Sequence, residues 1–385
     1  MVSSGPVGVG FIGTGMISRT YLENLTRFPD VRVVILGDVN VDVARAQAER
    51  FGIAEWGGAD DVLAHPEVEV VVNLTLPAVH AEVSAKAVAA GKHVWSEKPI
   101  SIDRESGRDL LAAAATAGLL VGVAPDTVLG PGVQSARRAI ARGDIGEPLA
   151  AQTALQYIGP DSFHPNPEFY YLPGGGPVFD MGPYYVTTLV HVFGSVASVA
   201  AFGSTGRKQR TVEVGDRRGT TFDVQVPTHV SAIAQFVDGA VSQSVYSFDS
   251  PLKRQGLVEI TGTEGTLVIP DPNRFTGEVK IARGPAVTDV LDPEARTAAL
   301  RAPQIWEDVP VTGVYAERGL GVLDLARASR TGGQPLASGD LGYHVLDTLV
   351  AIDEAVSERR VVPVESRVDR VPLVADDFDP FARTL

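Results

Sequence analysis

The sequence predicts an α/β protein built in two parts. Up to about residue 125, short apolar runs rich in β-branched residues alternate with longer segments of helical periodicity. Beyond that point, strand-like runs follow one another across tight turns, of which Asp238-Gly239 is the strongest hairpin signal. The first pattern is typical of a doubly wound parallel sheet, and the second of an α+β domain with a mostly antiparallel open sheet. We therefore expect two domains, residues 1–125 and residues 126–385.

The first part alternates strands and helices from its start. Glycines at 91 and 118 directly follow two helical segments, where a helix commonly ends in the left-handed conformation. The predicted strands are Val7–Ile12, Val31–Leu36, Val68–Thr75, His93–Ser96 and Leu119–Val123. The predicted helices are Met16–Phe28, Val41–Phe51, Ala78–Ala90 and Arg104–Ala117. Repeated strand–helix units of this kind imply a parallel sheet with right-handed crossovers.

The second part places a loop rich in glycine and proline, Gly159–Pro177, among helices and hairpins. The predicted helices are Gly132–Arg142, Met181–Phe193, Arg318–Arg330 and Tyr343–Glu358. The predicted strands are Val230–Val237, Ala240–Phe248, Leu257–Thr261 and Thr266–Ile269. Hairpins of this kind make an antiparallel sheet. The stretch Asp292–Glu307 shows no clear pattern.

Composition excludes several classes of function. The chain has 385 residues and a formal net charge of −14, from 33 basic and 47 acidic residues. This balance argues against a nucleic acid or a membrane surface as partner. The absence of cysteine excludes disulfides and thiolate catalysis, and no histidine has metal-ligand spacing, so we expect no metal. The N-terminus lacks the basic region of a signal peptide, and no apolar run is long enough to span a membrane, so we expect a cytoplasmic protein.

The segment Gly13–Ser18, with the sequence GTGMIS, directly follows the first strand and opens the first helix. A glycine at 13 permits a tight turn, and one at 15 lets the backbone approach a pyrophosphate. Ser18 is small enough for close packing of the helix on the strand, although glycine or alanine is usual there. In this context the segment predicts a Rossmann dinucleotide-binding loop. The alternative is a structural turn.

Asp38 ends the second strand, about 25 residues after the first glycine. A carboxylate there can accept hydrogen bonds from both ribose hydroxyls of the adenosine and would repel a 2′-phosphate. The residue therefore favours NAD over NADP. The alternative is that Asp38 caps the next helix, a role for which Asn40 competes.

Two further motifs carry side chains suited to proton chemistry. Ser96–Pro99, with the sequence SEKP, ends a predicted strand, where ligands bind in open α/β sheets, and Lys98 can polarise an oxygen there. Asp180 and Tyr184 share one helix face if a helix begins near Asp180. A cation lowers the pKa of a nearby phenol, so a tyrosine beside a lysine is a candidate proton donor or acceptor. The alternatives are an exposed charge pair, a helix cap and a packed aromatic ring.

In this order, the features resemble the glucose-fructose oxidoreductase and inositol dehydrogenase family (Gfo/Idh/MocA) over nearly the whole chain. GFIGTGMIS is similar to the cofactor loop of that family, SEKP to its E-K-P signature, and GGGPVFDMGPYY to its active-site helix. DIGEP at Asp144–Pro148 resembles the segment that enters the second domain.

The resemblance implies a nicotinamide cofactor, with NAD favoured by Asp38, and an assignment for each motif. The implied cofactor neighbours are Gly13, Gly15, Met16, Ile17, Asp38, Thr75, Pro77, His80, Glu97 and Lys98. The implied catalytic residues are Lys98, Asp180 and Tyr184. Tyr184 stands where many members carry histidine and glucose-fructose oxidoreductase carries tyrosine. The resemblance also implies a homodimer or homotetramer formed through the C-terminal sheet.

The resemblance further implies hydride transfer between the secondary hydroxyl of a sugar, sugar derivative or polyol and the nicotinamide. Where many members carry arginine or asparagine after the last Rossmann strand, this chain has Asp126 and Thr127, which could bind sugar hydroxyls. His164 lies in an aromatic loop suited to stacking on a sugar face, unless that loop lies at the surface. Two other functions stay open, an NAD-dependent glycosidase of the same fold and a dinucleotide-binding sensor without turnover.

Overall fold

The computed structural model describes residues 5–284 and 292–385, and its first part is a six-stranded parallel sheet. The strands are β1 (Val7–Ile12), β2 (Val31–Gly37), β3 (Glu55–Gly57), β4 (Val70–Asn73), β5 (His93–Ser96) and β6 (Val121–Val123). Their order is β3-β2-β1-β4-β5-β6, which is the doubly wound order with its reversal point between β1 and β4. Every residue of β1 and β4 is buried, as expected for strands covered on both faces.

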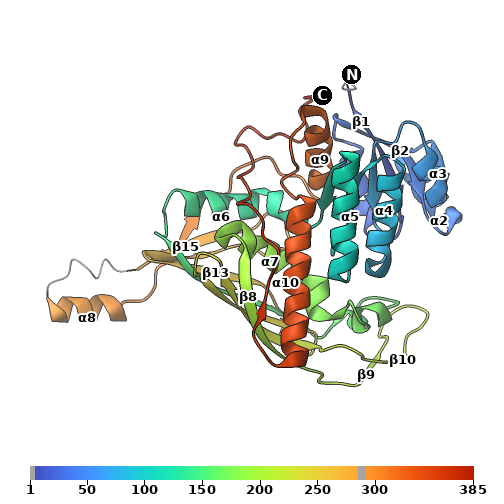
Figure 1. Ribbon diagram of the computed structural model, residues 1–385. Coiled ribbons are helices and arrows are strands. Elements are labelled where there is room, and N and C mark those ends of the chain that lie inside the picture. Colours follow the sequence, from blue (N-terminus) through green and yellow to red (C-terminus); the bar gives the residue numbers. More distant parts are fainter. Residues whose placement is uncertain (1–4, 285–291) are drawn as a thin grey trace.

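Helices connect these strands and cover the sheet. They are α1 (Ser18–Leu25), α2 (Val41–Phe51), α3 (Ala59–Ala64), α4 (His80–Ala89) and α5 (Arg104–Ala117), with a 3₁₀ turn, η1 (Pro77–Val79), before α4. Gly52 and Gly118 end α2 and α5 with φ angles of 69° and 66°. Helices α4 and α5 lie side by side, and α5 also contacts the long C-terminal helix α10 (Gly339–Glu358; Figure 1).

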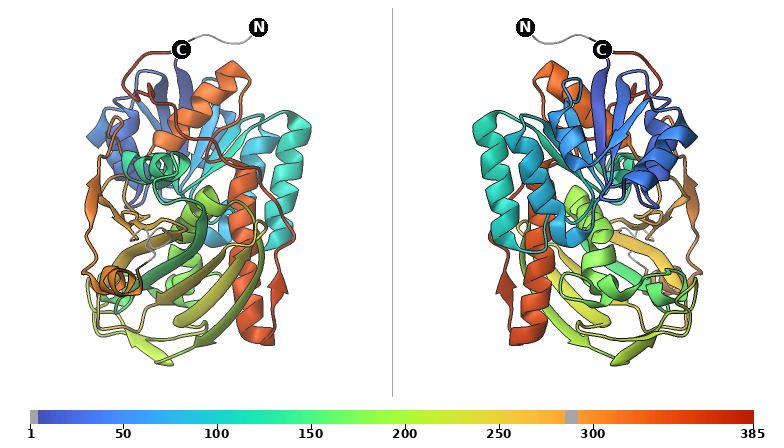
Figure 2. Two further views of the ribbon diagram at one scale, coloured as in Figure 1. Left: turned by 90° about the vertical axis from the view of Figure 1, so that its left-hand side faces the viewer. Right: turned by 90° about the vertical axis from the view of Figure 1, so that its right-hand side faces the viewer.

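The second part is a nine-stranded sheet that lies below the first in the views of Figures 1 and 2. Its strands are β7 (Pro148–Gln156), β8 (Val196–Ser204), β11 (His229–Phe236), β12 (Val241–Ser247), β13 (Arg254–Gly262), β14 (Gly265–Val268), β15 (Val279–Arg283), β16 (Glu307–Val309) and β17 (Val362–Pro363). All neighbouring strands run antiparallel except β7 and β12. A separate two-stranded sheet joins β9 (Gln209–Thr211) and β10 (Thr221–Asp223). The predicted α/β class with a mostly antiparallel second sheet is confirmed.

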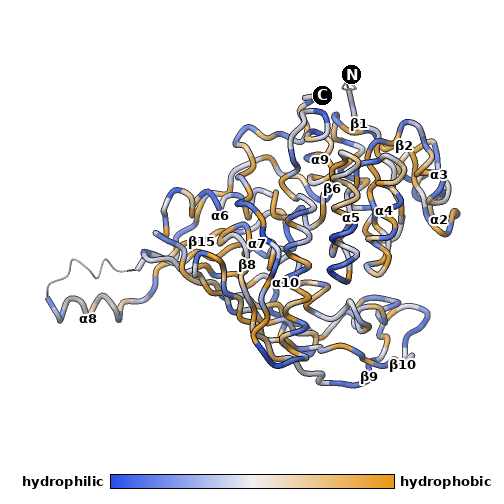
Figure 3. Tube along the Cα trace, viewed as in Figure 1, coloured by the Kyte–Doolittle hydropathy of each residue, from blue (hydrophilic) through white to orange (hydrophobic). Residues whose placement is uncertain are grey.

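Helices of the second part hold the two sheets together. Helices α7 (Gly176–Phe193) and α10 pack on one face of the large sheet, while α6 (Pro131–Ala141) contacts α7. Helix α8 (Pro293–Arg301) projects away from the body (Figure 1). Figure 3 shows apolar residues along the strands and polar residues along the outer loops. Short 3₁₀ turns η2 (Asp126–Leu129), η3 (Pro160–Ser162) and η4 (Glu168–Tyr171) join these elements.

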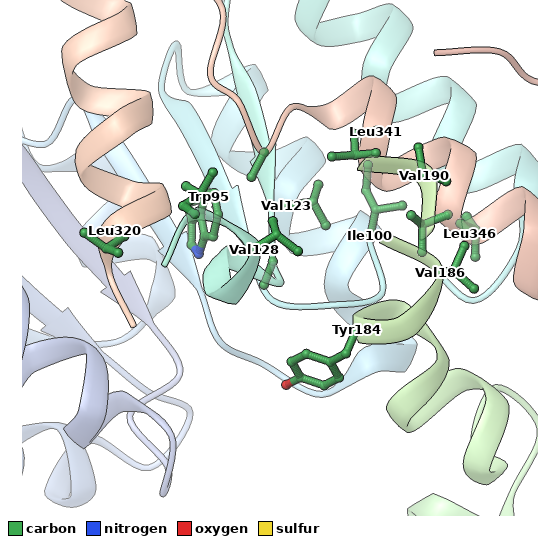
Figure 4. Close-up of a cluster of buried hydrophobic side chains, with 14 of the residues drawn as sticks. Trp95, Ile100, Val123, Val128, Tyr184, Val186, Val190, Leu320, Leu341 and Leu346 are labelled. Carbon is green, nitrogen blue, oxygen red and sulfur yellow. The ribbon is translucent and has the colours of Figure 1, made fainter. Parts of the chain in front are cut away.

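The chain returns to the parallel sheet near its end, through α9 (Leu320–Thr331). Trp95 of β5 is fully buried against this helix, and a Cβ at Gly321 would lie 1.9 Å from its ring. Figure 4 shows the apolar cluster between the two parts, with Trp95 beside Leu320 and with Tyr184 at its margin. The contact requires a residue without a side chain at 321. The division of the chain near residue 125 stays a prediction, because α9 packs across it.

The helices and strands predicted from periodicity are all present, most of them within three residues of the predicted ends. Helix α7 begins five residues earlier than predicted and α10 four residues earlier. The longest strands that were not predicted are β7 and β8, since small and polar residues interrupt their apolar pattern. Within the described residues no helix is long and apolar enough to cross a membrane. The same residues contain no cluster of three or more histidine or acidic side chains that could hold a metal ion.

Candidate active site

The carboxyl ends of four parallel strands bring the predicted site residues of the first part to one edge of the sheet. Gly13 follows β1, Asp38 follows β2, Thr75 lies two residues beyond β4, and Lys98 lies two residues beyond β5. Ligands of doubly wound sheets bind at this edge, close to the point where the strand order reverses. The fold therefore collects residues that are up to 85 positions apart in the sequence.

The glycine loop has the geometry that a dinucleotide requires. Gly13 has a φ angle of +98°, and a Cβ there would lie 2.7 Å from the Leu74 carbonyl. At Gly15, by contrast, no atom lies within 4 Å of the position of a Cβ, so a ligand can approach the backbone closely. The Ser18 hydroxyl donates to the Gly15 carbonyl at 2.7 Å, which secures the loop on α1. Met16, at the tip of the loop, is 69% exposed.

Asp38 supports the loop from the end of β2. Its Oδ2 accepts hydrogen bonds from the Thr14 backbone N–H at 2.7 Å and from the Thr14 hydroxyl at 3.0 Å. Its Oδ1 accepts from the Asn40 N–H at 2.9 Å. Asn40 itself caps α2, by accepting from the Asp42 N–H, so the alternative in which Asp38 caps that helix is wrong. A carboxylate has about four acceptor positions, so Asp38 keeps capacity for a ribose hydroxyl.

The turn after β4 is braced from behind by His80. This side chain is 1% exposed, and its Nδ1 and Nε2 lie 2.7 Å from the Pro99 carbonyl and 2.9 Å from the Thr75 carbonyl. The predicted direct contact of His80 with the cofactor is therefore replaced by an indirect role, because the ring has no surface left for a ligand. His80 ties the Thr75 turn to the Lys98-Pro99 turn. Thr75 and Pro77 are both half-buried at the edge.

Lys98 forms an ion pair with Asp180 of α7 across the two parts of the molecule. Its Nζ donates to the Asp180 carbonyl at 2.5 Å and to Asp180 Oδ1 at 3.0 Å. Burial alone would lower the pKa of Lys98, but Asp180 and other nearby acidic groups raise it above its ordinary value. Lys98 therefore stays a cation at neutral pH. An ammonium group has three N–H donors, so one remains for a ligand.

Helix α7 explains why Asp180 and Tyr184 meet Lys98. The helix begins at Gly176, and Asp180 lies inside it, so the alternative of Asp180 as a helix cap is wrong. Spacing by four places Asp180 and Tyr184 on one face. Pro183 lies between them and cannot donate a hydrogen bond within the helix. Because the missing N–H would have bonded to the Phe179 carbonyl, the proline loosens the turn that contains Asp180, whose own carbonyl accepts from Lys98.

Tyr184 lies between two cations. The Lys98 Nζ is 5.1 Å from the centroid of its ring, and the Arg318 Nη2 donates to its hydroxyl oxygen at 2.9 Å. The ring is 4% exposed, and Figure 4 shows its hydroxyl pointing away from the labelled aliphatic side chains. Arg318, directly before the α9 cap Gly319, was not predicted. No sequence motif distinguishes it from the other arginines of that segment.

Glu97, Asp126 and Asn273 surround the guanidinium of Arg318. Its Nη2 donates to Asn273 Oδ1 at 3.0 Å, and its Nη1 lies 3.8 Å from Glu97 Oε1 and 3.9 Å from Asp126 Oδ1. Burial would raise the pKa of Glu97, but Arg318 and Lys98 lower it overall. Glu97 faces this buried cluster and accepts a hydrogen bond from the Tyr21 hydroxyl at 2.9 Å. Its predicted cofactor contact stays a prediction.

Asp126 and Thr127 do not reach the cavity beside Lys98, contrary to the substrate contacts predicted for them. Both are fully buried, and Asp126 Oδ2 accepts from the backbone N–H groups of Gly319 and Gly321 at 2.8 Å and 3.1 Å. Asp126 thus holds the start of α9, where a carboxylate is favoured by the helix dipole. No local pattern indicates that a helix nearly 200 residues later uses this carboxylate.

An aromatic group borders a cavity of about 130 Å³ beside Lys98 and Asp180. Phe169 and Tyr170 line the cavity, and their ring centroids are 4.0 Å apart. His164 packs its ring edge to face against both, at 5.4 Å and 5.5 Å, and is not part of the lining. Phe169 and Tyr170 form the aromatic surface beside the cavity, with His164 as their support, and the stacking of a sugar on it stays a prediction.

Comparisons with known proteins agree with this geometry. Residues 7–124 match the model of an oxidoreductase family with an NAD-binding Rossmann fold, and residues 133–268 match that of the GFO/IDH/MocA C-terminal domain. The chain belongs to the Gfo/Idh/MocA family. The predicted oxidoreductase class and the predicted NAD-binding Rossmann domain are confirmed.

Two curated relatives in this family cover nearly the whole chain. The chain is 27% identical to 1,5-anhydro-D-fructose reductase of Ensifer adhaerens, over 93% of this chain and 98% of the relative. It is 26% identical to levoglucosan dehydrogenase of Pseudarthrobacter phenanthrenivorans, over 91% and 95%. A solved structure of levoglucosan dehydrogenase with NADH superposes with a TM-score of 0.78 at 22% identity, over 94% of this chain and 100% of that chain, which shows a shared fold.

Proposed function

We propose that this Gfo/Idh/MocA protein transfers a hydride between NAD and the secondary hydroxyl of a sugar, sugar derivative or polyol. The observation that supports this most is the Lys98–Asp180 ion pair, which lies beside the Tyr184 ring at the edge where a dinucleotide binds. An oxidoreductase of carbinols needs a cation for the oxygen and a group that exchanges its proton. This site has both.

Lys98 holds the substrate oxygen. Two of its N–H groups are engaged by Asp180, and the third is free to donate to a hydroxyl or carbonyl. Because its pKa is raised, Lys98 does not act as the base. It stabilises the negative charge on the oxygen, which develops as the O–H proton leaves in oxidation or as the C–H bond forms in reduction, and Asp180 fixes the direction of the ammonium group.

Tyr184 exchanges the hydroxyl proton of the substrate. Its oxygen accepts a hydrogen bond from Arg318, and the neighbouring lysine can only donate. Neither cation can take the tyrosine proton, so the hydroxyl can donate it to a substrate oxygen held by Lys98 in reduction, and the ionised oxygen takes the substrate proton in oxidation. Lys98 thus stabilises the charge on the oxygen, and Tyr184 transfers the proton.

The residues at the sheet edge fit a dinucleotide. The backbone of Gly13, Gly15, Met16 and Ile17 would hold the pyrophosphate at the start of α1, and Asp38 the adenosine ribose. Thr75 and Pro77 would lie beside the nicotinamide. When bound, the nicotinamide ring supplies the hydride donor or acceptor.

A neutral, partly apolar polyol suits the cavity. Its lining combines Lys98 and Asp180 with Pro77, Phe169 and Tyr170, and carbohydrate C–H faces stack on aromatic rings. Curated relatives are named 1,5-anhydro-D-fructose reductase, levoglucosan dehydrogenase and D-apiose dehydrogenase. We infer a substrate of this class, such as an aldose or an anhydro sugar.

A panel of sugars and polyols, offered with NAD and with NADP, tests the function. We expect NADH to accumulate with at least one member of the panel, and NAD to be preferred because the Asp38 carboxylate repels a 2′-phosphate. A strong preference for NADP would overturn the role of Asp38. Cleavage of a glycoside without net formation of NADH would instead favour the glycosidase. Tight binding of NAD without any turnover would favour a sensor.

We also propose that copies of the chain assemble through the outer face of the large sheet. Exposed apolar side chains on this face include Phe202, Ile233 and Val241, which are 75%, 52% and 40% exposed. Monomers rarely expose so many apolar side chains side by side. Light scattering should give a homodimer or homotetramer, and Ile233→Glu should lower its molar mass. A monomeric wild-type chain would contradict the proposal.

A further inference from the structure

Arg318 is the only side chain in the described part of the chain that donates a hydrogen bond to the Tyr184 hydroxyl. It comes from the turn before α9, 134 residues after Tyr184. Its side chain is 11% exposed, and its guanidinium carbon is 5.7 Å from the Tyr184 ring centroid. The contact is therefore a buried link between α9, which covers the parallel sheet, and the helix that carries the predicted proton-exchanging group.

The surroundings fix Arg318 in place from both sides. Asp126 accepts from Gly319 and Gly321, and so holds the backbone next to the arginine. The carboxyl oxygens Glu97 Oε1 and Asp126 Oδ1 lie within 4 Å of Nη1, and Asn273 accepts from Nη2. Burial would lower the pKa of Arg318, but Tyr184 and Glu97 raise it above its ordinary value. The group is a permanent cation with a fixed direction.

The chemistry of the two partners determines the orientation of the tyrosine proton. A guanidinium only donates, so the Tyr184 oxygen must accept at that position, and its own hydrogen has to point elsewhere. The ammonium of Lys98, on the other side, also only donates. Arg318 thus excludes the orientation in which the hydroxyl hydrogen points towards the guanidinium.

We propose that Arg318 is a positioning residue, which acts through Tyr184 by holding the hydroxyl in the orientation that exchanges a proton with substrate. The proposal rests on the proposed function, in which Tyr184 performs that exchange. Without Arg318 the hydroxyl can rotate or bind water. Turnover then slows, although the cofactor site and Lys98 are unchanged.

A double-mutant cycle of Arg318 and Tyr184 tests the proposal. A hydrogen bond to a charged group corresponds to about a 10- to 100-fold effect, so Arg318→Gln should lower kcat by that factor with little change in the KM for NAD. In the Tyr184→Phe background, Arg318→Gln should lower kcat by less than about 3-fold, since the group it positions is gone. Equal losses in both backgrounds would overturn the proposal.

Three further measurements separate positioning from folding and from failure of the proposed function. Arg318→Lys should keep more activity than Arg318→Gln. Guanidinium ion at non-denaturing concentration should restore part of the activity of Arg318→Ala. Equal activities of the lysine and glutamine variants, together with no restoration by guanidinium, would count against positioning. Arg327→Gln removes a different arginine, which lies in α9 and pairs with Asp30, and should leave kcat unchanged. A fully active Tyr184→Phe enzyme would overturn the proposed proton role itself, whereas additive losses overturn only the role of Arg318.

Discussion

The two halves of the molecule are stabilised by different interactions. In the parallel sheet, β1 and β4 are buried throughout and apolar except for Asn73, and their functional features are backbone turns at the strand ends. In the second half, buried polar side chains connect segments that are far apart in the sequence. As whole residues, Arg210, His344 and Arg318 expose 3%, 0% and 9% of their surface. The first half can be read from local patterns, whereas the second depends on long-range contacts.

Arg210 is one such buried polar side chain that connects distant segments. It donates to the Ile158 carbonyl at 2.7 Å and to the Phe248 carbonyl at 2.7 Å, and it pairs with Asp161 and Asp249. These bonds attach the loop before the aromatic group to β9 and to the end of β12. Arg210 therefore ties this loop to the sheet, alongside the packing of the buried Tyr171 on Phe222 and Phe248.

The largest effect should come from removing this arginine. Arg210→Gln leaves the buried Asp161 and the partly buried Asp249 without their cation, and removal of one partner of a buried pair typically costs about 3–5 kcal/mol of unfolding free energy. Denaturant unfolding measures the loss. Arg217→Gln is the matched control, because Arg217 lies between β9 and β10 and pairs with Glu168 at the surface. A loss of less than 1 kcal/mol for Arg210→Gln would show that the loop does not depend on this contact.

His344 should make the second half sensitive to acid. Its Nε2 accepts from the Val196 N–H at 2.9 Å, which requires a neutral ring, and burial lowers its pKa from 6.5 to about 4. Between these values the unfolded state binds the proton and the folded state does not, so stability falls as the pH falls through this window. The expected loss from pH 6.5 to 4 is about 3 kcal/mol.

Unfolding free energies measured across this range, for the wild type and for His344→Gln, check the assignment. The variant should lose the part of the slope that His344 contributes, while His191 and His80, whose pKa values burial also lowers, retain their parts. An unchanged slope in His344→Gln would place the acid sensitivity elsewhere.

The contact between the halves gives an intermediate effect. Gly321→Ala would place a Cβ 1.9 Å from the Trp95 ring, and overpacking of this kind costs about 1–3 kcal/mol. Gly333→Ala is the control, because its nearest atom would be 3.6 Å away. Thermal unfolding of both variants tests the close approach of α9. Equal melting temperatures would mean that α9 can shift without cost.

The smallest effect concerns the aromatic border of the cavity. Phe169→Ala should raise the KM for the sugar by about 3- to 10-fold and leave the KM for NAD unchanged, since aromatic contacts contribute about 0.5–1.5 kcal/mol beyond area. Phe163→Ala, in the same loop but outside the cavity lining, should change neither constant. A KM change confined to NAD would show that Phe169 borders the cofactor instead.

Sequence patterns predicted the cofactor side well because its chemistry is local. The loop at Gly13 and the acid at Asp38 occur at a fixed distance within one strand–helix–strand unit, and the structure places both at the same edge. The aromatic border was predicted through His164, although Phe169 and Tyr170 line the cavity, because spacing in an irregular loop does not determine which ring faces inward.

Residues whose roles depend on distant partners could not be predicted in the same way. Asp126 was expected at the substrate because it follows the last parallel strand, yet the start of α9 uses its carboxylate. Arg318 could not be predicted, because its role depends on Tyr184 and Glu97, which are more than 130 positions away. Such contacts arise from the docking of the two halves and leave no periodic signal.

The most direct test of the central claim is the turnover rate of Lys98→Ala with NAD and the best substrate of the panel. Loss of the cation beside the reacting oxygen should lower kcat by at least about 10²-fold. NAD binding, followed by fluorescence, should persist. Lys86→Ala is the control, because Lys86 is an exposed lysine that pairs with Glu82 on α4, and its rate should equal that of the wild type. A Lys98→Ala enzyme that turns over at the wild-type rate would contradict the account.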